Sequence, residues 1–230
     1  REVASVSYGM IPFALMVSVV AVFLIMQPDI GTLIVIVMTA GLLYLLGGGK
    51  TSQAVILFLL GIGVLYLVVQ VAPYRLSRLL VFLNPGSDPQ GAGYQISQAF
   101  IAIGSGGFWG LGFGKSVQKY QYLPEPMGDS IFAIFAEEMG FFGVVLLIAC
   151  FFLFFLKGLR IAKLAPDVFG KLLAAGIAAG IMSQAFVNMA AISGLMPLTG
   201  IPLPFISYGG TSLAITLAGV GILLNISRHT

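Results

Sequence analysis

Six long apolar segments alternate with short polar ones along this chain. They cover residues 10–26, 32–48, 53–72, 130–156, 172–192 and 208–226. An α-helix rises about 1.5 Å per residue, so each segment is long enough, or nearly so, to cross the hydrocarbon core of a bilayer. The pattern therefore predicts an all-α polytopic membrane protein, with six transmembrane helices in one integral-membrane domain, residues 1–230.

One long stretch, residues 73–129, cannot lie in a membrane throughout. It contains the glycine-rich string GSGGFWGLGFG (104–114). A dinucleotide-binding loop has similar glycine spacing, but it follows a strand and opens a helix, and neither context exists here. We therefore expect short helical or re-entrant elements in this loop, with Phe108 and Trp109 at the depth of the lipid headgroups.

Positive charge predicts which side of the membrane this loop faces. Lys and Arg flank the ends of the apolar segments that point away from the loop, whereas the short connections 27–31 and 193–207 contain neither residue. Short loops rich in Lys and Arg stay in the cytoplasm. The loop 73–129 is therefore expected on the extracytoplasmic side.

Composition supports this class and excludes several others. Of the 230 residues, 59% are hydrophobic and 8% are charged, whereas a soluble domain carries roughly 25% charged residues. Cys150 is the single cysteine and His229 the single histidine, so neither a disulfide framework nor a zinc site has support. The net charge of +3 mostly flanks the apolar segments, so nucleic-acid binding is not predicted.

Asp129 stands directly before the fourth apolar segment and has two interpretations. As an N-cap, its carboxylate would accept backbone N–H bonds of the first helical turn, and the spacing alone favours this role. As a general base at the outer surface of the membrane, it would take a proton from a substrate. One carboxylate can do both, so the two interpretations stay open at this point.

Other polar residues have a structural and a functional interpretation as well. Arg75 and Arg78 would share a helical face and could clamp a phosphate, although contact with lipid headgroups is the favoured explanation without further context. Charges within an apolar segment are costly, so Glu137 and Glu138 indicate either function or a satisfied structural role. Gln95 and Gln98 would share one helical face, and Gln184 and Asn188 would share another. For Gln184 and Asn188 we expect inter-helix hydrogen bonds.

Four strings, in order, resemble one protein family closely. They are QPDIGT (27–32), GAGYQISQAFIAIGSGG (91–107), YLPEPMGDSIFAIFAEEMGFFG (122–143) and GIPLPFISYGGTSL (200–213). On these strings the chain is similar to the SEDS family of cell-wall glycan polymerases, the FtsW/RodA group. Two further strings, APYRLSRLLVFLNP and GKSVQKYQYLPE, look more like FtsW, the division member, than RodA, the elongation member.

The resemblance implies a fold of ten transmembrane helices, of which these six would be the fifth to the tenth. It implies polymerisation of lipid II into peptidoglycan outside the bacterial cytoplasmic (inner) membrane, here at the division septum. It also implies a class B penicillin-binding transpeptidase and other divisome proteins as partners, in contact with membrane lipid. The essential acidic residue of the family maps onto Asp129, although Met127, Gly128 and Ser130 stand where many members have His, Thr and Phe.

The mechanism that this resemblance suggests is a direct displacement. Asp129 would take the proton of an acceptor sugar hydroxyl, which attacks the anomeric carbon of a donor and releases a lipid pyrophosphate. No cofactor is fixed by the resemblance, and a divalent cation, Mg²⁺ or Mn²⁺, is a candidate for neutralising the pyrophosphate. Candidate substrate contacts are Arg75, Arg78, Gln95, Gln98, Lys115, Lys119, Glu125, Glu138, Ser207 and Tyr208.

Three alternatives belong to the same set of hypotheses. A RodA-type polymerase would perform the same chemistry during elongation. A lipid II flippase would need a polar path through the membrane, and Glu137 and Glu138 supply an incomplete one. A scaffold that activates a transpeptidase would not need the Asp129 carboxylate.

Overall fold

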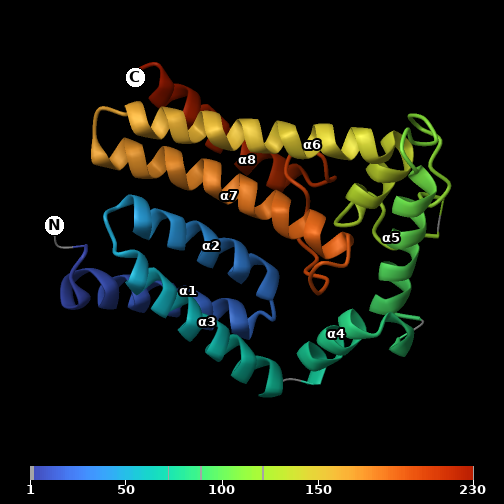
Figure 1. The fold of residues 1–230 in the computed structure, drawn as a ribbon, viewed down its shortest axis with the longest axis horizontal. Helices are drawn as coiled ribbons and strands as arrows, with labels where there is room; N and C mark the ends of the chain where they lie inside the picture. The colour runs from blue at the N-terminus through green and yellow to red at the C-terminus, as the bar shows by residue number, and fades with distance from the viewer. Residues whose placement is uncertain (1–2, 72, 89, 121, 230) are drawn as a thin grey trace.

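The structure is a computed structural model in which helices are joined by short turns and irregular segments (Figure 1). It describes residues 3–71, 73–88, 90–120 and 122–229, with the side chains of residues 65–77 outside the description. No strand occurs among these described residues. A π-helical turn, Val6–Met10, leads into the helices, which are α1 (Ile11–Met26), α2 (Ile30–Leu46), α3 (Thr51–Val71), α4 (Pro73–Leu83), α5 (Ala92–Gly106), α6 (Ile131–Leu164), α7 (Val168–Ile192) and α8 (Gly210–Ser227).

Each predicted apolar segment coincides with one helix, namely α1, α2, α3, α6, α7 and α8. Within the described residues, four stretches are long and apolar enough to cross a membrane by length and composition: Val6–Met26, α6, α7 and α8. Helix α6 continues to Leu164, beyond the expected end at residue 156, because no helix breaker occurs before Pro166. The chain is thus an all-helical polytopic membrane protein.

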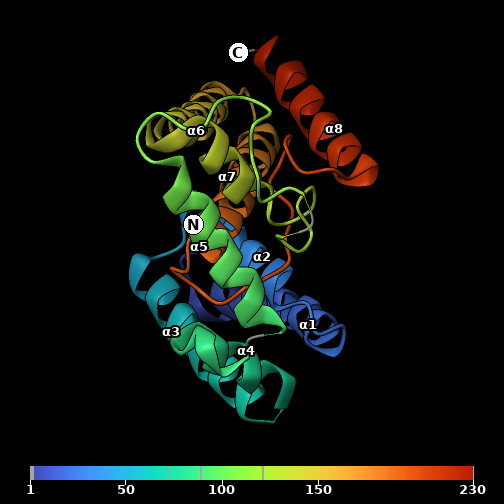
Figure 2. The same ribbon diagram turned by 90° about the vertical axis from the view of Figure 1, so that its right-hand side faces the viewer.

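Helix α7 is the centre of the bundle and lies between α2 and α6 (Figure 1). Small residues allow this close packing, since a Cβ added to Gly158 of α6 would lie 2.3 Å from the Cβ of Ala178. Figure 2 shows α8 at one side of α6 and α7, and α3 with α4 at the opposite side. The buried alanines that make α7 narrow are Ala174, Ala175, Ala178, Ala179, Ala185, Ala190 and Ala191.

The long loop contains two helices, α4 and α5, as the sequence predicts for short helical elements. A 3₁₀ turn, Pro85–Ser87, separates them. The carboxylate of Asp88 accepts hydrogen bonds from the backbone N–H groups of Gly91 (3.0 Å) and Ala92 (3.0 Å), which fixes the start of α5. Helix α5 then packs against α6 at one end of the bundle (Figure 1).

The backbone of α6 breaks at Gly140, which has φ +64°. The loop that follows α5, residues 107–114, lies alongside this break and pairs with it through the main chain. Leu111 N–H donates to Glu137 O (2.9 Å) and Gly112 N–H to Glu138 O (3.0 Å). The N–H of Phe141, just past the break, donates in turn to a loop carbonyl, that of Gly107 (2.9 Å).

The glycine-rich string is explained by this close approach of two backbones. Gly110 has φ +81°, and a Cβ there would lie 2.1 Å from the carbonyl oxygen of Glu138. Phe108 and Trp109 are exposed. The ring of Phe108 lies beside that of Phe141 (centroids 5.7 Å apart), and the ring of Trp109 lies beside that of Phe142 (6.1 Å). Their headgroup depth stays a prediction.

The break at Gly140 gives a test of this packing. A methyl group in Gly140→Ala would lie 2.3 Å from the backbone nitrogen of Gly110 at a residue with positive φ. We expect the free energy of unfolding to fall by about 2 kcal/mol or more, measured by thermal unfolding in detergent. Gly104→Ala is the matched control, because its Cβ would meet nothing within 4 Å, and it should leave stability equal or slightly higher. Equal unfolding temperatures for the two variants would contradict the packing described.

Candidate active site

Asp129 lies in a tight turn between the long loop and α6. The carbonyl oxygen of Glu125 accepts hydrogen bonds from Gly128 N–H (3.0 Å) and Ser130 N–H (3.3 Å), which closes the turn. Glu125 has φ +48° and stands between two prolines, so the turn does not continue as a helix. This turn holds Asp129 one residue before the helix cap.

The carboxylate of Asp129 is not the helix cap. The N-cap position of α6 belongs to Ser130, whose side chain makes no capping hydrogen bond. The Asp129 Oδ1 atom instead accepts long hydrogen bonds from Gln95 Nε2 (3.4 Å) and Ser130 Oγ (3.4 Å). Gln95 Nε2 also donates to Ser130 Oγ (2.9 Å), so the three side chains form one cluster. The spacing favoured the capping role, and the geometry excludes it.

Burial sets the electrostatics of this carboxylate. Loss of hydration raises the pKa of Asp129 above its ordinary value, the bonds from Gln95 and Ser130 act in the opposite direction, and the nearby negative charge of Glu125 adds to the rise. A carboxylate with a raised pKa is a stronger base than an ordinary aspartate. The turn therefore presents a half-buried carboxylate that favours accepting a proton.

A second segment, residues 196–209, forms a wall beside the turn. Asn188 of α7 donates from Nδ2 to the carbonyl oxygens of Asp129 (2.8 Å) and Ile201 (2.7 Å). Gln184, on the same face of α7, donates to Pro202 O (2.9 Å). Both amides thus bond to main-chain carbonyls of irregular segments, where inter-helix bonds were expected.

Ser207 and Tyr208 join the wall to the turn. Ser207 Oγ donates to Gly128 O (2.7 Å) and accepts from Leu203 N–H (2.7 Å). The N–H of Tyr208 donates to Met127 O (2.8 Å), while its side chain is 84% exposed. Ser207 therefore fixes the turn through its side chain, and Tyr208 contacts it through its backbone while its side chain stays exposed.

The QPDIGT string (27–32), at the start of α2, packs against the wall. Asp29 caps α2, since its carboxylate accepts from Thr32 N–H (2.9 Å) and Thr32 Oγ1 (2.6 Å). A Cβ added to Gly31 would lie 2.7 Å from Ile201 Cγ1, so only glycine allows α2 to start this close to the wall.

Arg78 of α4 donates to Leu198 O (3.1 Å) of the same segment, beside a cavity of about 110 Å³.

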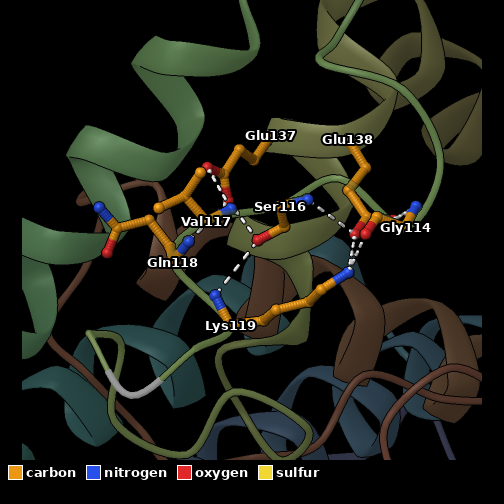
Figure 3. A network of polar contacts seen from close by, with 7 residues as sticks. All are labelled: Gly114, Ser116, Val117, Gln118, Lys119, Glu137 and Glu138. Carbon is orange, nitrogen blue, oxygen red and sulfur yellow. Dashed lines mark hydrogen bonds and ion pairs between the residues drawn. The ribbon is translucent and has the colours of Figure 1, made fainter.

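Glu137 lies in a separate polar cluster, shown in Figure 3. It is 1% exposed. Its carboxylate accepts a short hydrogen bond from Ser116 Oγ and further bonds from the N–H groups of Val117 (3.1 Å) and Gln118 (3.4 Å). These contacts satisfy the buried charge through a loop of the chain itself.

Glu138 binds the same loop from the next position of α6 (Figure 3). It accepts from Gly114 N–H (2.9 Å) and Ser116 N–H (3.2 Å), and it forms an ion pair with Lys119 Nζ (2.9 Å). The two predicted substrate contacts, Glu138 and Lys119, are thus bonded to each other and to the loop 114–119.

Six of the predicted substrate contacts divide into two groups. The structure brings Gln95, Glu125, Ser207 and Tyr208 to the Asp129 turn, while Glu138 and Lys119 serve the other cluster. The sequence did not single out Ser130 or assign Asn188 to the turn, although the four-residue spacing from Gln184 did place Asn188 on a polar face. Gln98 is half-buried one turn after Gln95, Lys115 is exposed on the loop, and Arg75 of α4 has its side chain outside the described part.

The predicted divalent cation can be compared with the acidic residues near the turn. In the part of the chain that the structure describes, no group of three or more His, Cys, Asp or Glu side chains is placed to hold a metal. The turn offers Asp129 and Glu125 alone. Mg²⁺ takes six oxygens and usually binds through one or two carboxylates together with substrate phosphates and waters. Asp129 and Glu125 would therefore hold such a cation only together with a bound pyrophosphate, and we derive no step through one.

These features define a polytopic membrane protein with a half-buried aspartate between two irregular segments at one end of its helices. The chain belongs to the family described as cell cycle protein, which groups FtsW, RodA and SpoVE, and whose model matches residues 1–230.

Relatives and solved structures agree with this family. Stage V sporulation protein E of Bacillus subtilis (strain 168) is 42% identical over 230 residues, which are 100% of this chain and 63% of the relative. The probable peptidoglycan glycosyltransferase FtsW of Trichlorobacter lovleyi is 44% identical over 96% of this chain and 58% of its own length. The chain thus spans about 60% of the length of these curated relatives.

A solved structure of a peptidoglycan synthase complex, which concerns the coordination of polymerization and crosslinking, has a TM-score of 0.74 to this chain. It is 29% identical, and the match covers 99% of this chain and 64% of that one. A crystal structure of the Thermus thermophilus rod shape determining protein RodA gives a TM-score of 0.61 at 27% identity, over 94% of this chain and 55% of that one. The predicted FtsW/RodA group is confirmed.

The Glu137 cluster makes a stability prediction. Glu137→Gln exchanges one acceptor oxygen for an NH₂ group that faces donors of the loop 114–119. We expect the free energy of unfolding to fall by about 2–3 kcal/mol, with faster proteolysis within the loop. Lys115→Gln, an exposed change in the same loop, should leave both measurements unchanged. Equal behaviour of the two variants would show that the carboxylate does not hold the loop.

The raised pKa of Asp129 makes a second stability prediction. A carboxyl whose pKa is higher in the folded than in the unfolded protein stabilises the fold when protonated, and this stabilisation is lost as the pH rises through the folded pKa. Asp129→Asn cannot ionise, so it should unfold at a higher temperature than the natural protein at neutral pH. The difference should vanish below pH ~4, the ordinary pKa of aspartate. A lower unfolding temperature for the variant at neutral pH would contradict the assigned burial.

Proposed function

We propose that this chain carries the acceptor-activating site of a peptidoglycan glycosyltransferase that polymerises lipid II, with Asp129 as the general base. The observation that carries the proposal is the state of the Asp129 carboxylate. It is half-buried, free of the capping role and held by two side-chain donors. Relatives at 41–44% identity that are named probable peptidoglycan glycosyltransferases support the reaction class.

The two carboxylate oxygens of Asp129 have different surroundings. Both side-chain hydrogen bonds go to Oδ1, so we assign Oδ2 to the substrate. Gly200 stands beside Oδ2, and a Cβ added there would lie 3.9 Å from it. Gly200 also has φ +70°, so glycine is favoured by the backbone and leaves room for a sugar hydroxyl.

The reaction step is a single displacement at the anomeric carbon. As the acceptor hydroxyl oxygen bonds to that carbon, its proton passes to Asp129 Oδ2. The bond from the carbon to the pyrophosphate oxygen breaks, and the lipid pyrophosphate leaves with the electron pair. Attack from the opposite side inverts an α-linkage to a β-linkage. Help from a positioned base in such a step is worth roughly 10²–10⁴-fold.

The leaving pyrophosphate needs positive charge nearby. Lys119 is compensated by Glu138, which weakens its candidacy. Lys115 is exposed on the loop, and Arg78, which also bonds to Leu198 O, borders the cavity beside the wall. We propose these two as phosphate contacts on their position. Gln98, Glu125 and Tyr208 are proposed contacts for the sugars.

The proposed setting is the outer face of the bacterial cytoplasmic membrane at the division septum, with a transpeptidase of the class B penicillin-binding type and divisome proteins as partners. Similarity to a synthase complex that couples polymerization to crosslinking supports the transpeptidase. Similarity to proteins named FtsW supports a division-type role over elongation. A flippase is less supported, because the carboxylates of Glu137 and Glu138 are taken up by the loop and line no described polar path.

The test is polymerisation of lipid II by the intact protein with its transpeptidase partner in liposomes. Asp129→Ala should lower the rate by roughly 10²–10⁴-fold. Because the base must be ionised, the rate should fall on the acid side with a midpoint above the ordinary pKa of aspartate. Glu125→Gln is the comparison variant, since removing its charge should move that midpoint to lower pH. Undiminished polymerisation by Asp129→Ala would reject the general base, and unchanged septal function would favour a scaffold.

A further inference from the structure

Asn188 connects the two irregular segments of the site to the most buried helix. Its side chain is 1% exposed. One nitrogen, Nδ2, donates to the carbonyl oxygen of Asp129 (2.8 Å) in the turn and to that of Ile201 (2.7 Å) in the wall. These partners are 59 and 13 residues away along the chain, so the amide fixes a contact that local sequence does not.

The side-chain amide of Asn188 supplies hydrogen-bond donors to two main-chain carbonyls of the site. A buried carbonyl outside regular structure requires a hydrogen-bond donor, and at the end of a membrane helix few donors are within reach. The acceptor oxygen of Asn188, Oδ1, is buried without a partner in the described part of the chain. Leucine would fill a similar volume without donors, and aspartate would bring an acceptor against two acceptors. Only the amide suits both carbonyls.

The bond to Asp129 acts on the base through its own main chain. Fixing the carbonyl of Asp129 fixes the peptide plane from which the side chain projects, and fixing Ile201 places Gly200 beside Oδ2. The same amide therefore sets both the base and the wall that leaves room for the substrate. Ser207, by comparison, bonds to Gly128, the residue before Asp129, and to Leu203, two residues after Ile201. It therefore contacts neither Asp129 nor Ile201 through these bonds.

We propose that Asn188 is the positioning residue of this site, which holds Asp129 and the 200–201 segment in register for proton transfer. This inference rests on the proposed role of Asp129 as general base. Asn188 bonds to the main-chain carbonyl of Asp129 and so acts on the carboxylate through the main chain.

The chain offers a matched control in Gln184. It lies one turn earlier on α7 and also donates one amide hydrogen bond to the wall, at Pro202 O (2.9 Å). It makes this bond without one to Asp129. Loss of Gln184 therefore reports what a wall bond contributes to folding, separately from the position of the base.

The experiment compares Asn188→Leu, Gln184→Met and Asp129→Ala in the intact protein, with lipid II polymerisation measured against pH. Asn188→Leu should lower kcat by roughly ten- to a hundredfold, with KM changed less than about threefold, because a displaced base costs rate more than binding. Its acid midpoint should move to lower pH, since a carboxylate released from the turn regains water. Gln184→Met should keep the midpoint and stay within about threefold in kcat.

A second measurement does not depend on activity. The rate at which a carbodiimide labels Asp129, followed by mass spectrometry against pH, reports the protonation of its carboxyl, and the midpoint should fall in Asn188→Leu but not in Gln184→Met. If Asn188→Leu does not fold, Asn188→Ala leaves space for water to serve the two carbonyls and should show the same shift.

The outcomes separate the two proposals. Identical kcat, acid midpoint and labelling in the Asn188 and Gln184 variants would reduce Asn188 to a fold-stabilising residue and overturn the inference. Persistent polymerisation by Asp129→Ala would reject the proposed function instead. A labelling shift in Asn188→Leu together with a lost rate in Asp129→Ala supports both.

Discussion

Irregular backbone that is buried at the end of membrane helices must find its hydrogen-bond partners within the protein, and this requirement organises the site. Three such segments belong to this part of the structure, residues 107–120, 123–130 and 196–209. Side chains of two helices supply much of what they need. Glu137 and Glu138 of α6 accept from the first segment, and Asn188 and Gln184 of α7 donate to the other two. Acidic side chains thus serve the N–H groups and amide side chains serve the carbonyls.

This division leaves charge unevenly distributed. The ion pair with Lys119 compensates Glu138, while Asp129 and Glu125 face each other as two acids in one turn. The fold stabilises the first cluster and leaves the second with a carboxyl whose pKa is raised above its ordinary value, chiefly by burial. Sites where burial and like charge oppose ionisation are common places for acid and base chemistry. The same helix, α6, begins beside the half-buried Asp129 and carries Glu137 and Glu138, which bond to the loop 114–119, further along.

The sequence was informative where the signal is local and failed where it depends on distant partners. The six helices follow from hydropathy because each segment must satisfy the membrane by itself. Spacing could not decide the role of Asp129, because a cap and a base occupy the same position before a helix. The bond from Gln95 joins residues 34 positions apart, and no periodicity reports it. Glu137 and Glu138 lie in an apolar run, which predicts that each carboxylate has a polar partner. The pattern does not distinguish a substrate from another part of the chain as that partner. The glycine string was likewise visible, but its reason, the break at Gly140, was not.

The central place of α7 has a consequence for how the protein is assembled in the membrane. This helix is the least hydropathic of the four spanning candidates and the most covered by its neighbours. Its alanines, Gln184 and Asn188 suit close packing and hydrogen bonding, and they give it the weakest preference for lipid. The strongly apolar α6 precedes it by a connection of a few residues and offers the face that shields those polar groups. We therefore expect insertion of α7 to depend on α6, so that the contacts which hold the turn and the wall also bear on how the helix enters the membrane.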